Sequence, residues 1–200
     1  MHEIILKKFD QWTRNVNQEE KRISIFEHIR DIPYFVTYVT DPVRGPVKLL
    51  VQNRGNCSPK HFLLSAMYEK LEIPVKYVSY PFVWSDQKIE FPEKLKKLTD
   101  KLPVCYHVAL MAHINHKWVL LDVTWDPPLK RVNFPVNETW DGFSDTQNAV
   151  TPMGEVIHES IQERLDYLEK TAKYTEVQLD LFDTFRSELN TWVQKVRSEV

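Results

Sequence analysis

The chain has 200 residues, of which 42% are hydrophobic and 27% charged, and a formal net charge of −2. A chain of this length suits one domain with a sizeable core, so we expect a single domain over residues 1–200. The chain does not have the excess of basic residues that is typical of nucleic-acid-binding proteins. Neither a signal peptide nor an apolar run of roughly 18 residues is evident, so we expect a cytoplasmic protein with no membrane partner.

The N-terminal segment predicts helices. Over residues 1–32, apolar side chains recur at helical spacing in two stripes, and Pro33 ends the second. Residues 34–48 contain two prolines and Gly45 between short apolar pieces, which predicts an irregular connection. A further helix is expected over residues 59–72, where apolar residues again recur at helical spacing.

The middle of the chain predicts strands. Residues 75–84 are rich in β-branched and aromatic side chains, and residues 104–112 and 117–124 predict a hairpin. Before that hairpin, residues 91–102 predict a short surface helix with its lysines outward. Residues 125–154 are rich in Pro, Asn, Asp and Trp without a sustained period, so we expect a long ordered loop with room for one short strand.

The C-terminal segment, about residues 155–200, predicts two helices packed on the N-terminal ones. From Val156 onward the apolar residues keep a helical spacing. A homodimer through these helices is an alternative, although the heptad pattern is not clean. The whole pattern predicts an α+β fold in which helices flank a small antiparallel sheet.

Cys57 stands where a loop passes into the helix expected over 59–72. Ser58 can cap that helix, and Pro59 suits its first turn. A thiol at this place lies close to the positive end of the helix dipole and to unpaired backbone N–H groups, both of which favour the nucleophilic thiolate. A lone cysteine at a helix start can equally be a small buried side chain.

The predicted hairpin brings a histidine and an aspartate together. Side chains alternate along a strand, so His107 and Asp122 fall on the same face. With a four-residue turn at 113–116 the two residues lie directly opposite each other, and with a two-residue turn at 115–116 they lie one diagonal step apart. Opposed Cβ atoms are about 4.5–5.5 Å apart, which suits an aspartate–imidazole hydrogen bond.

Cysteine, histidine and aspartate in this chain order indicate acyl transfer by a thiol nucleophile. Cys57 would attack a carbonyl carbon as thiolate, and His107 would protonate the leaving group. Asp122 would fix the imidazole tautomer and stabilise its charged form. The backbone N–H of Cys57 is a natural oxyanion donor, and the side-chain amide of Gln52 could supply a second one.

Around these residues the sequence resembles the transglutaminase-like superfamily of papain-type folds. The similarity runs from about Ile29 to Leu129 and includes G-N-C opening a helix, the phrase L-E-I-P-V-K-Y-V, and then W-V-L-L-D-V-T-W-D-P. Three features depart from the family's pattern: Glu72 replaces the usual glycine, the aromatic residue that members often have beside the histidine is absent, and Ser58-Pro59 follow the nucleophile where many members have tryptophan. These departures bear on the substrate and the direction of the reaction rather than on the three catalytic positions.

The resemblance implies a papain-like core over residues 29–129 in which Cys57, His107 and Asp122 are catalytic. The expected function is thiol-dependent hydrolysis or transfer at an amide or peptide bond, through a cysteine thioester, on a peptide, protein or small amide substrate. R-G-N-C also resembles the R-G-G-x-C of arylamine N-acetyltransferases, which are one alternative. A binding module that keeps the fold without activity is another.

Metal binding is a further alternative. Several ligand-type side chains occur in the middle of the chain: Cys57, His61, Cys105, His107, His113 and His116. No C-x-x-C or H-E-x-x-H spacing is present, so we expect no metal and no cofactor. Two cysteines exclude a disulfide framework, and Cys105 is expected to be a packing residue close to the cleft.

Overall fold

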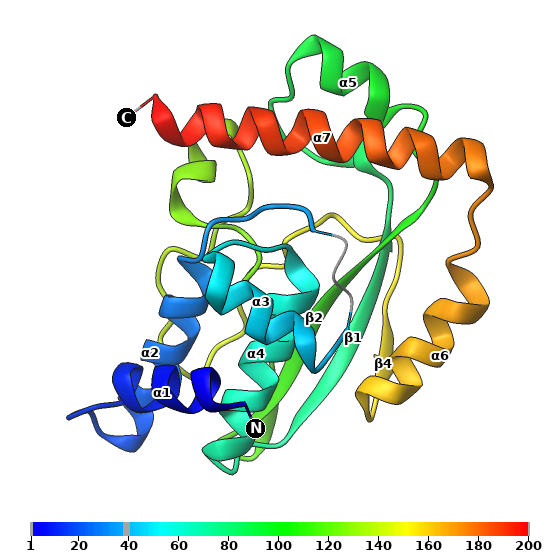
Figure 1. Cartoon of the computed structure of the whole chain (residues 1–200). Coiled ribbons are helices and arrows are strands. Elements are labelled where there is room, and N and C mark those ends of the chain that lie inside the picture. Colours follow the sequence, from blue (N-terminus) through cyan, green and yellow to red (C-terminus); the bar gives the residue numbers. More distant parts are fainter. Residues whose placement is uncertain (1, 38–40, 200) are drawn as a thin grey trace.

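An antiparallel sheet lies at the centre of the computed structural model, which describes residues 2–37 and 41–199 (Figure 1). In the described part of the chain this sheet has four strands, which follow one another in space as β3 (Lys117–Leu121), β2 (Cys105–Ile114), β1 (Val75–Phe82) and β4 (Val156–His158). All neighbouring strands run antiparallel. The predicted α+β fold, with helices beside a small antiparallel sheet, is therefore confirmed.

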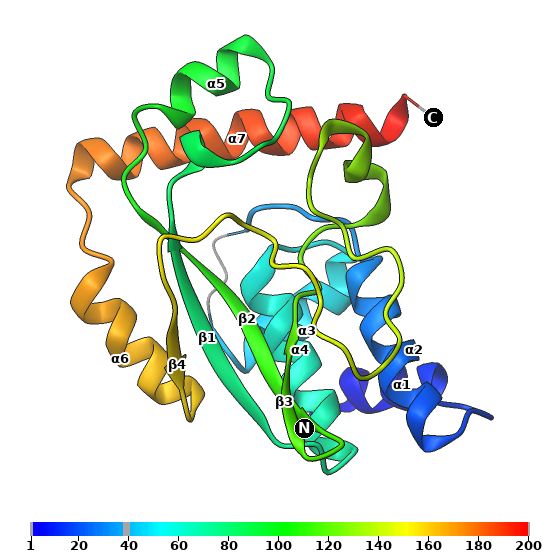
Figure 2. The ribbon, with the colours of Figure 1, turned by 180° about the vertical axis from the view of Figure 1, so that it is seen from behind.

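The N-terminal helices gather on one face of this sheet (Figures 1 and 2). They are α1 (Glu3–Trp12), α2 (Gln18–Arg30), α3 (Arg44–Gln52) and α4 (Cys57–Lys70). α4 contacts β2 directly, while α2 and α3 pack on α4 from outside. The helix that begins with Cys57 is therefore held between the sheet and its neighbouring helices.

Alternation along β2 explains why α4 sits there. Val108 and Leu110 point from β2 into one apolar cluster, where they meet fully buried side chains of α4 such as Leu63 and Met67. The intervening residue, Ala109, belongs to a second cluster on the other face of the strand. Burial of both faces leaves no freedom to slip the register by one residue, because every side chain would change sides.

The C-terminal helices do not pack on the N-terminal ones, and that prediction is wrong. α6 (Ile161–Thr171) packs against β1 and β4, and α7 (Glu176–Ser198) packs against α5 (Glu93–Thr99) and the 3-10 helix η2 (Pro127–Val132). Figure 2 shows α7 lying across the end of the sheet farthest from α1.

Tertiary packing explains this placement of α7. Its apolar stripe is buried in the second cluster, with the aromatic side chains that follow β1 and β3, and comprises Phe182, Phe185, Leu189, Val193 and Val196. Helical spacing reports that a stripe exists but not which surface it covers. Most of the α7 residues that indicated a homodimer are thus buried within their own chain, whereas Leu179 is exposed, and the dimer stays a prediction.

Two segments differ from the predicted elements. The irregular connection expected over 34–48 contains the start of α3, whose Pro46 falls in the first turn, where proline is tolerated because the N–H groups there have no helical partner. Part of that prediction, residues 38–40, lies outside the described residues. In addition, the segment expected to be helical from Val156 begins with β4, and α6 starts only after Ser160, whose side chain caps it.

The remaining elements lie close to their predicted positions. The expected loop over residues 125–154 is confirmed, apart from the short helix η2 within it. α4 begins at Cys57 rather than at residue 59, so Asn56 and not Ser58 occupies the N-cap position. No helix in the described part of the chain combines the length and the apolar character that crossing a membrane needs.

Arg197 fastens α7 to the rest of the fold. Its guanidinium donates to both carboxylate oxygens of Asp126, each at 2.7 Å, and to the carbonyl oxygen of Tyr34 at 2.9 Å. Asp126 is buried and also accepts the backbone N–H of Tyr34 at 2.7 Å. A bidentate pair in such a place fixes distance and orientation together.

We expect Arg197→Ala to lower the free energy of unfolding by about 3 kcal/mol, because it leaves the buried Asp126 carboxylate without its counter-charge. Denaturant unfolding at neutral pH measures this. Lys195→Ala, an exposed change on the same helix, is the control and should stay within about 0.5 kcal/mol of the parent. Equal unfolding midpoints for the two variants would contradict this role of Arg197.

Candidate active site

Cys57 is the first residue of α4, and its position follows from the loop before it. Asn53 ends α3 with a left-handed backbone, φ +49°. Gly55 then approaches α3 so closely that a Cβ atom there would lie 2.6 Å from a methyl group of Leu49. The side chain of Asn56 makes no capping hydrogen bond, so the partial positive charge of the helix start is left facing the half-buried thiol.

The hairpin has the shorter of the two turns considered. Ile114 pairs with Lys117, so the turn is 115–116, where both residues have positive φ, as a tight two-residue turn requires. The register with a four-residue turn is therefore wrong, and His107 and Asp122 lie one diagonal step apart. Nε2 of His107 is 2.7 Å from Oδ2 of Asp122, so the predicted contact between the two side chains is present.

The carboxylate of Asp122 is fully enclosed by hydrogen-bond donors. Oδ2 also accepts the backbone N–H of Ala149 at 2.8 Å, and Oδ1 accepts the hydroxyl of Thr124 at 2.6 Å and its N–H at 3.1 Å. Burial opposes the ionised form, but the charge and hydrogen bond of His107, aided by His61 and Thr124, hold the pKa of Asp122 well below its usual range. Asp122 is therefore a permanent buried anion.

That anion changes the protonation of His107. Burial lowers the pKa of the imidazole, but Asp122 and the Cys57 sulfur raise it by more, to about 10. Burial also opposes a thiolate at Cys57, yet the hydrogen bond and charge of His107, the backbone of Val108 and the charge of Arg164 together lower the pKa of the thiol. Because Asp122 uses Nε2, Nδ1 is the nitrogen available to the sulfur. Both pKa shifts favour a thiolate–imidazolium pair over the neutral pair.

A second histidine, His61, connects α4 with the segment that carries Asp122. One turn after Cys57, its Nδ1 lies 2.8 Å from the Cys57 carbonyl oxygen, and its Nε2 accepts the N–H of Val123 at 3.3 Å. Burial lowers its pKa to about 4, so the ring is neutral with its proton on Nδ1. The sequence suggested His61 only as a metal-ligand type, because nothing in a helical pattern reveals a contact with a strand sixty residues away.

Lys60 makes a similar link from the neighbouring position. Its fully buried ammonium donates to the carbonyl oxygens of Arg30, Val123 and Thr124 at 2.9, 3.2 and 2.9 Å. Burial lowers its pKa to about 7. Lys60 and His61 therefore tie the start of α4 to the segment that carries Asp122, which sets the distance between nucleophile and acid.

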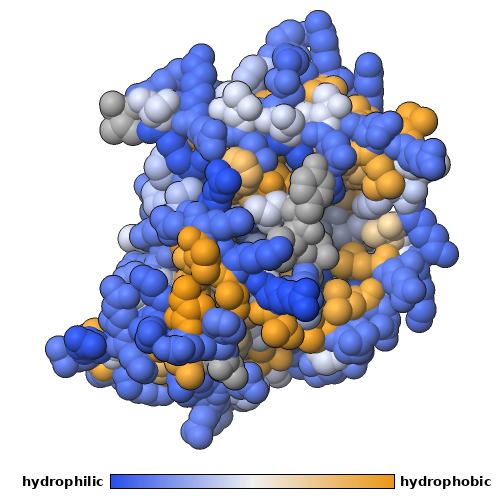
Figure 3. Space-filling model, viewed as in Figure 1, coloured by the Kyte–Doolittle hydropathy of each residue, from blue (hydrophilic) through white to orange (hydrophobic). Residues whose placement is uncertain are grey.

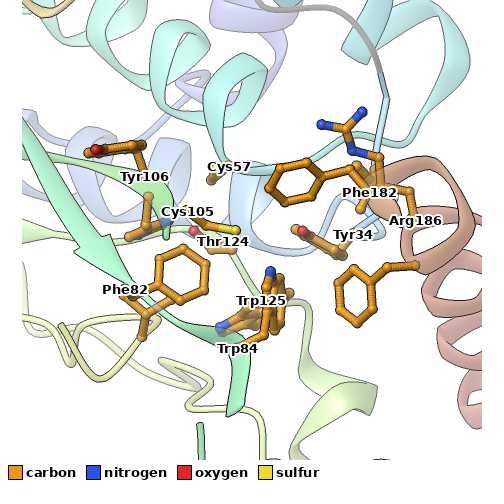
Figure 4. Close-up of a pocket in the computed structure, with 14 residues that line it drawn as sticks. Tyr34, Cys57, Phe82, Trp84, Cys105, Tyr106, Thr124, Trp125, Phe182 and Arg186 are labelled. Carbon is orange, nitrogen blue, oxygen red and sulfur yellow. The ribbon is translucent and has the colours of Figure 1, made fainter. Parts of the chain in front are cut away.

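A cavity of about 110 Å³ opens beside the thiol. Figure 4 shows Cys57 at one side of it, with aromatic rings from several elements around the rest. The lining residues used below are Tyr34, Phe82, Trp84, Trp125, Phe182 and Phe185, together with Cys57, Cys105, His107 and Arg186. Cys105 therefore lines the cleft, and burial raises its pKa to about 12, so it is a neutral thiol.

Gln52 is not part of this cavity. It is exposed at the end of α3 and lines a separate groove, where α3 and α7 meet, with residues such as Lys48 and Asn190. The cavity is lined instead by residues from the segment after α2, the start of α4, β1 and β2, the short helix after β1, the segment after β3, the 125–154 loop and α7. The geometry therefore brings Cys57, His107 and Asp122 together and leaves Gln52 apart from them.

The ligand-type side chains named from the sequence do not come together as a metal site within the described residues. Within residues 2–37 and 41–199, no three His, Cys, Asp or Glu side chains form a group suited to a metal ion. The His113 ring packs against Trp118 with centroids 5.1 Å apart, and His116 is exposed in the turn. Both cysteines are free thiols.

Comparisons with known proteins leave the function to be argued from the site. No protein-family model matches the sequence, and the curated protein sequences give no match. Among solved structures, the chain is similar to the crystal structure of a "putative cysteine protease" from Cytophaga hutchinsonii, with 15% identity and a TM-score of 0.43. The similarity covers 77% of this chain and 49% of the other, so the chain spans about half the length of that protein.

We expect alkylation by iodoacetamide to distinguish the two thiols. The pKa of Cys57 is lowered from the usual thiol value of 9.0 and that of Cys105 is raised to about 12, so Cys57 should react at a lower pH than an ordinary thiol and Cys105 hardly at all below pH 9. In His107→Gln, burial dominates, so the half-maximal pH for Cys57 should rise above the parent's. Peptide mass analysis of the labelled protein assigns each rate.

The control for that comparison is His28→Gln, a histidine change outside the site whose ring stacks on Trp12. It should leave the pH profile of Cys57 unchanged. Equal, slow labelling of Cys57 and Cys105 in the parent protein would refute the thiolate at Cys57.

Proposed function

We propose that the protein is a thiol-dependent acyl-transfer enzyme that cleaves an amide or peptide bond through a thioester on Cys57. The observation that carries this proposal is the buried chain from Asp122 through His107 to the Cys57 thiol, with 2.7 Å between Asp122 Oδ2 and His107 Nε2. A nucleophile, a base in contact with it and an orienting acid are the minimum set for this chemistry. Catalysis by these three residues is part of the proposal.

In the first half-reaction the thiolate of Cys57 attacks the carbonyl carbon, and a C–S bond forms. The negative charge that develops on the carbonyl oxygen faces the N-terminus of α4, where the N–H of Cys57 is a donor. The C–N bond then breaks, and the proton on Nδ1 of His107 passes to the leaving amine. The products of this step are a free amine, a neutral imidazole and the acyl-enzyme thioester.

In the second half-reaction water, or an amine, attacks the thioester carbonyl. His107 takes the proton of the attacking group at Nδ1, the C–S bond breaks, and the thiolate–imidazolium pair is restored. Asp122 keeps its negative charge throughout and stabilises the imidazolium in both halves. The cycle therefore needs no metal and no cofactor.

The sequence resemblance to the transglutaminase-like superfamily supports this assignment, since the same three residues occupy its catalytic positions. That family membership is itself part of the proposal, as is a peptide, protein or small amide substrate. The pKa of Cys105 is raised, so its thiol is neutral. This difference supports Cys57, rather than Cys105, as the nucleophile.

Removal of the nucleophile and of the orienting acid tests the proposal. With 4-nitrophenyl esters and glutamine or peptide amides as substrates, Cys57→Ala should abolish turnover. Asp122→Asn should lower kcat by roughly 10⁴-fold, because the amide stabilises the wrong tautomer and no longer balances the imidazolium. Intact-mass analysis should find an acyl adduct on the parent protein and none on Cys57→Ala.

Asp145→Asn is the matched control for Asp122→Asn, since Asp145 also accepts a backbone N–H, from Leu120, but is exposed and outside the cavity. It should retain parental kcat. Full activity of Cys57→Ala, or equal activity of the two Asp→Asn variants when both are folded, would overturn the assignment.

A further inference from the structure

The cavity beside Cys57 is closed by α7, a helix outside the segment that carries the three proposed catalytic residues. Three residues of α7, Phe182, Phe185 and Arg186, line it together with residues supplied by the sheet and the loops. Figure 4 labels Phe182 and Arg186 among them. On the face viewed in Figure 3, hydrophobic side chains gather just below α7 among mostly hydrophilic ones. A buried apolar space thus begins at the nucleophile and extends toward the C-terminal helix.

The walls of this cavity are aromatic, buried and mutually packed. Tyr34 lies 4.3 Å from Trp125 between ring centroids, and Trp84 lies 5.0 Å from Phe185. Each of these four side chains is almost completely buried. Rings that pack on one another in this way do not collapse into a neighbouring space, so the cavity keeps its shape without a ligand.

Polar side chains border the cavity at the proposed catalytic residues Cys57 and His107 and also at Arg186 of α7. The Arg186 guanidinium is 3.2 Å from Asp183 and lies over the ring of Phe182. Cys105 is a neutral thiol that behaves as a small apolar side chain, and the indole N–H of Trp125 is already satisfied by the carbonyl oxygen of Ala149 at 2.8 Å. The surface between the catalytic residues and Arg186 is therefore mainly apolar and suits an apolar group.

We propose that this cavity binds an apolar substituent of the acyl group that becomes attached to Cys57, so that the enzyme selects donors with a branched aliphatic acyl group. This inference rests on the proposed function. It assigns to α7, through Phe182 and Phe185, the role of setting which acyl group is accepted.

The location of the cavity favours the acyl group over the leaving group. After the first half-reaction the amine departs to solvent and another molecule takes its place, whereas the acyl group stays bonded to the sulfur. A space bordered by Cys57 and walled by buried rings suits the part that stays. Its 110 Å³ is less than the roughly 150 Å³ of an apolar cavity that accepts benzene. An isobutyl group is therefore the upper range of size, and a phenyl ring exceeds it.

A series of acyl donors with one fixed leaving group tests the inference. We expect kcat/KM to rise from acetyl to isovaleryl 4-nitrophenyl esters by roughly 10-fold or more for each methylene that enters the cavity. Phenylacetyl esters, whose ring exceeds the cavity, should be poorer than isovaleryl esters. A second series, with one acyl group and amines of increasing size, should change kcat/KM much less.

Two variants change the size of the cavity in opposite directions. Cys105→Leu adds two heavy atoms to the wall and should lower kcat/KM for isovaleryl relative to acetyl esters by at least 10-fold. Phe182→Leu removes ring atoms and should shift the preference toward larger acyl groups. The control is Glu188→Gln, which lies on α7 outside the cavity and pairs with Lys94, and which should leave the acyl preference unchanged.

The outcomes separate this inference from the proposed function. If acetyl esters form the Cys57 adduct but no acyl preference appears, or if the preference follows the leaving group, the cavity assignment is wrong and the proposed function stands. If no donor in the series forms an adduct on Cys57, both are wrong. A preference that moves in opposite directions in the two size variants supports the cavity assignment.

Discussion

The buried carboxylate of Asp122 is the interaction on which the rest of the structure depends. A negative charge in the interior is tolerated only when donors surround it, and here His107, Thr124 and Ala149 donate to its two oxygens. One of those donors is the imidazole of His107. The carboxylate stabilises the protonated form of this ring and thereby raises its pKa. The imidazolium in turn lowers the pKa of Cys57. Structural stability and the proposed reactivity thus share one cause.

The position of Asp122 also depends on contacts that hold the segment after it. The segment after Asp122 must stay against α4 to keep the carboxylate at its place, and the buried side chains of Lys60 and His61 hold it there through the backbone of Val123 and Thr124. Two residues after Thr124, the carboxylate of Asp126 accepts a hydrogen bond from Arg197 of α7. A single stretch of chain therefore positions the acid, the nucleophile helix and the helix that walls the cavity.

Local rules of chain geometry account for what the sequence predicted at this site. The alternation of side chains along a strand placed His107 and Asp122 on one face, and that inference holds for either turn length. The start of a helix at Cys57 followed within two residues from the spacing of apolar residues and from Pro59. Both inferences use contacts within a hairpin or within a helix.

What the sequence could not predict depends on contacts between distant segments. Ala149 and Thr146 contact Asp122 from a loop without periodicity, so no pattern pointed to them. The face covered by α7 was predicted wrongly, because an apolar stripe carries no information about its partner. β4 was overlooked for a different reason: three residues are too few to show a strand period, and pairing with the edge of β1 decides their conformation.

The most direct test of the account is the protonation of His107, followed by ¹⁵N NMR of the imidazole ring as a function of pH. The account predicts that both ring nitrogens stay protonated through neutral pH in the parent protein, with a pKa above the usual histidine value of 6.5. It also predicts that this pKa falls in Cys57→Ala, where the thiolate is lost. A ring that titrates at its ordinary value in both proteins would contradict the account, because no ion pair would then exist at Cys57.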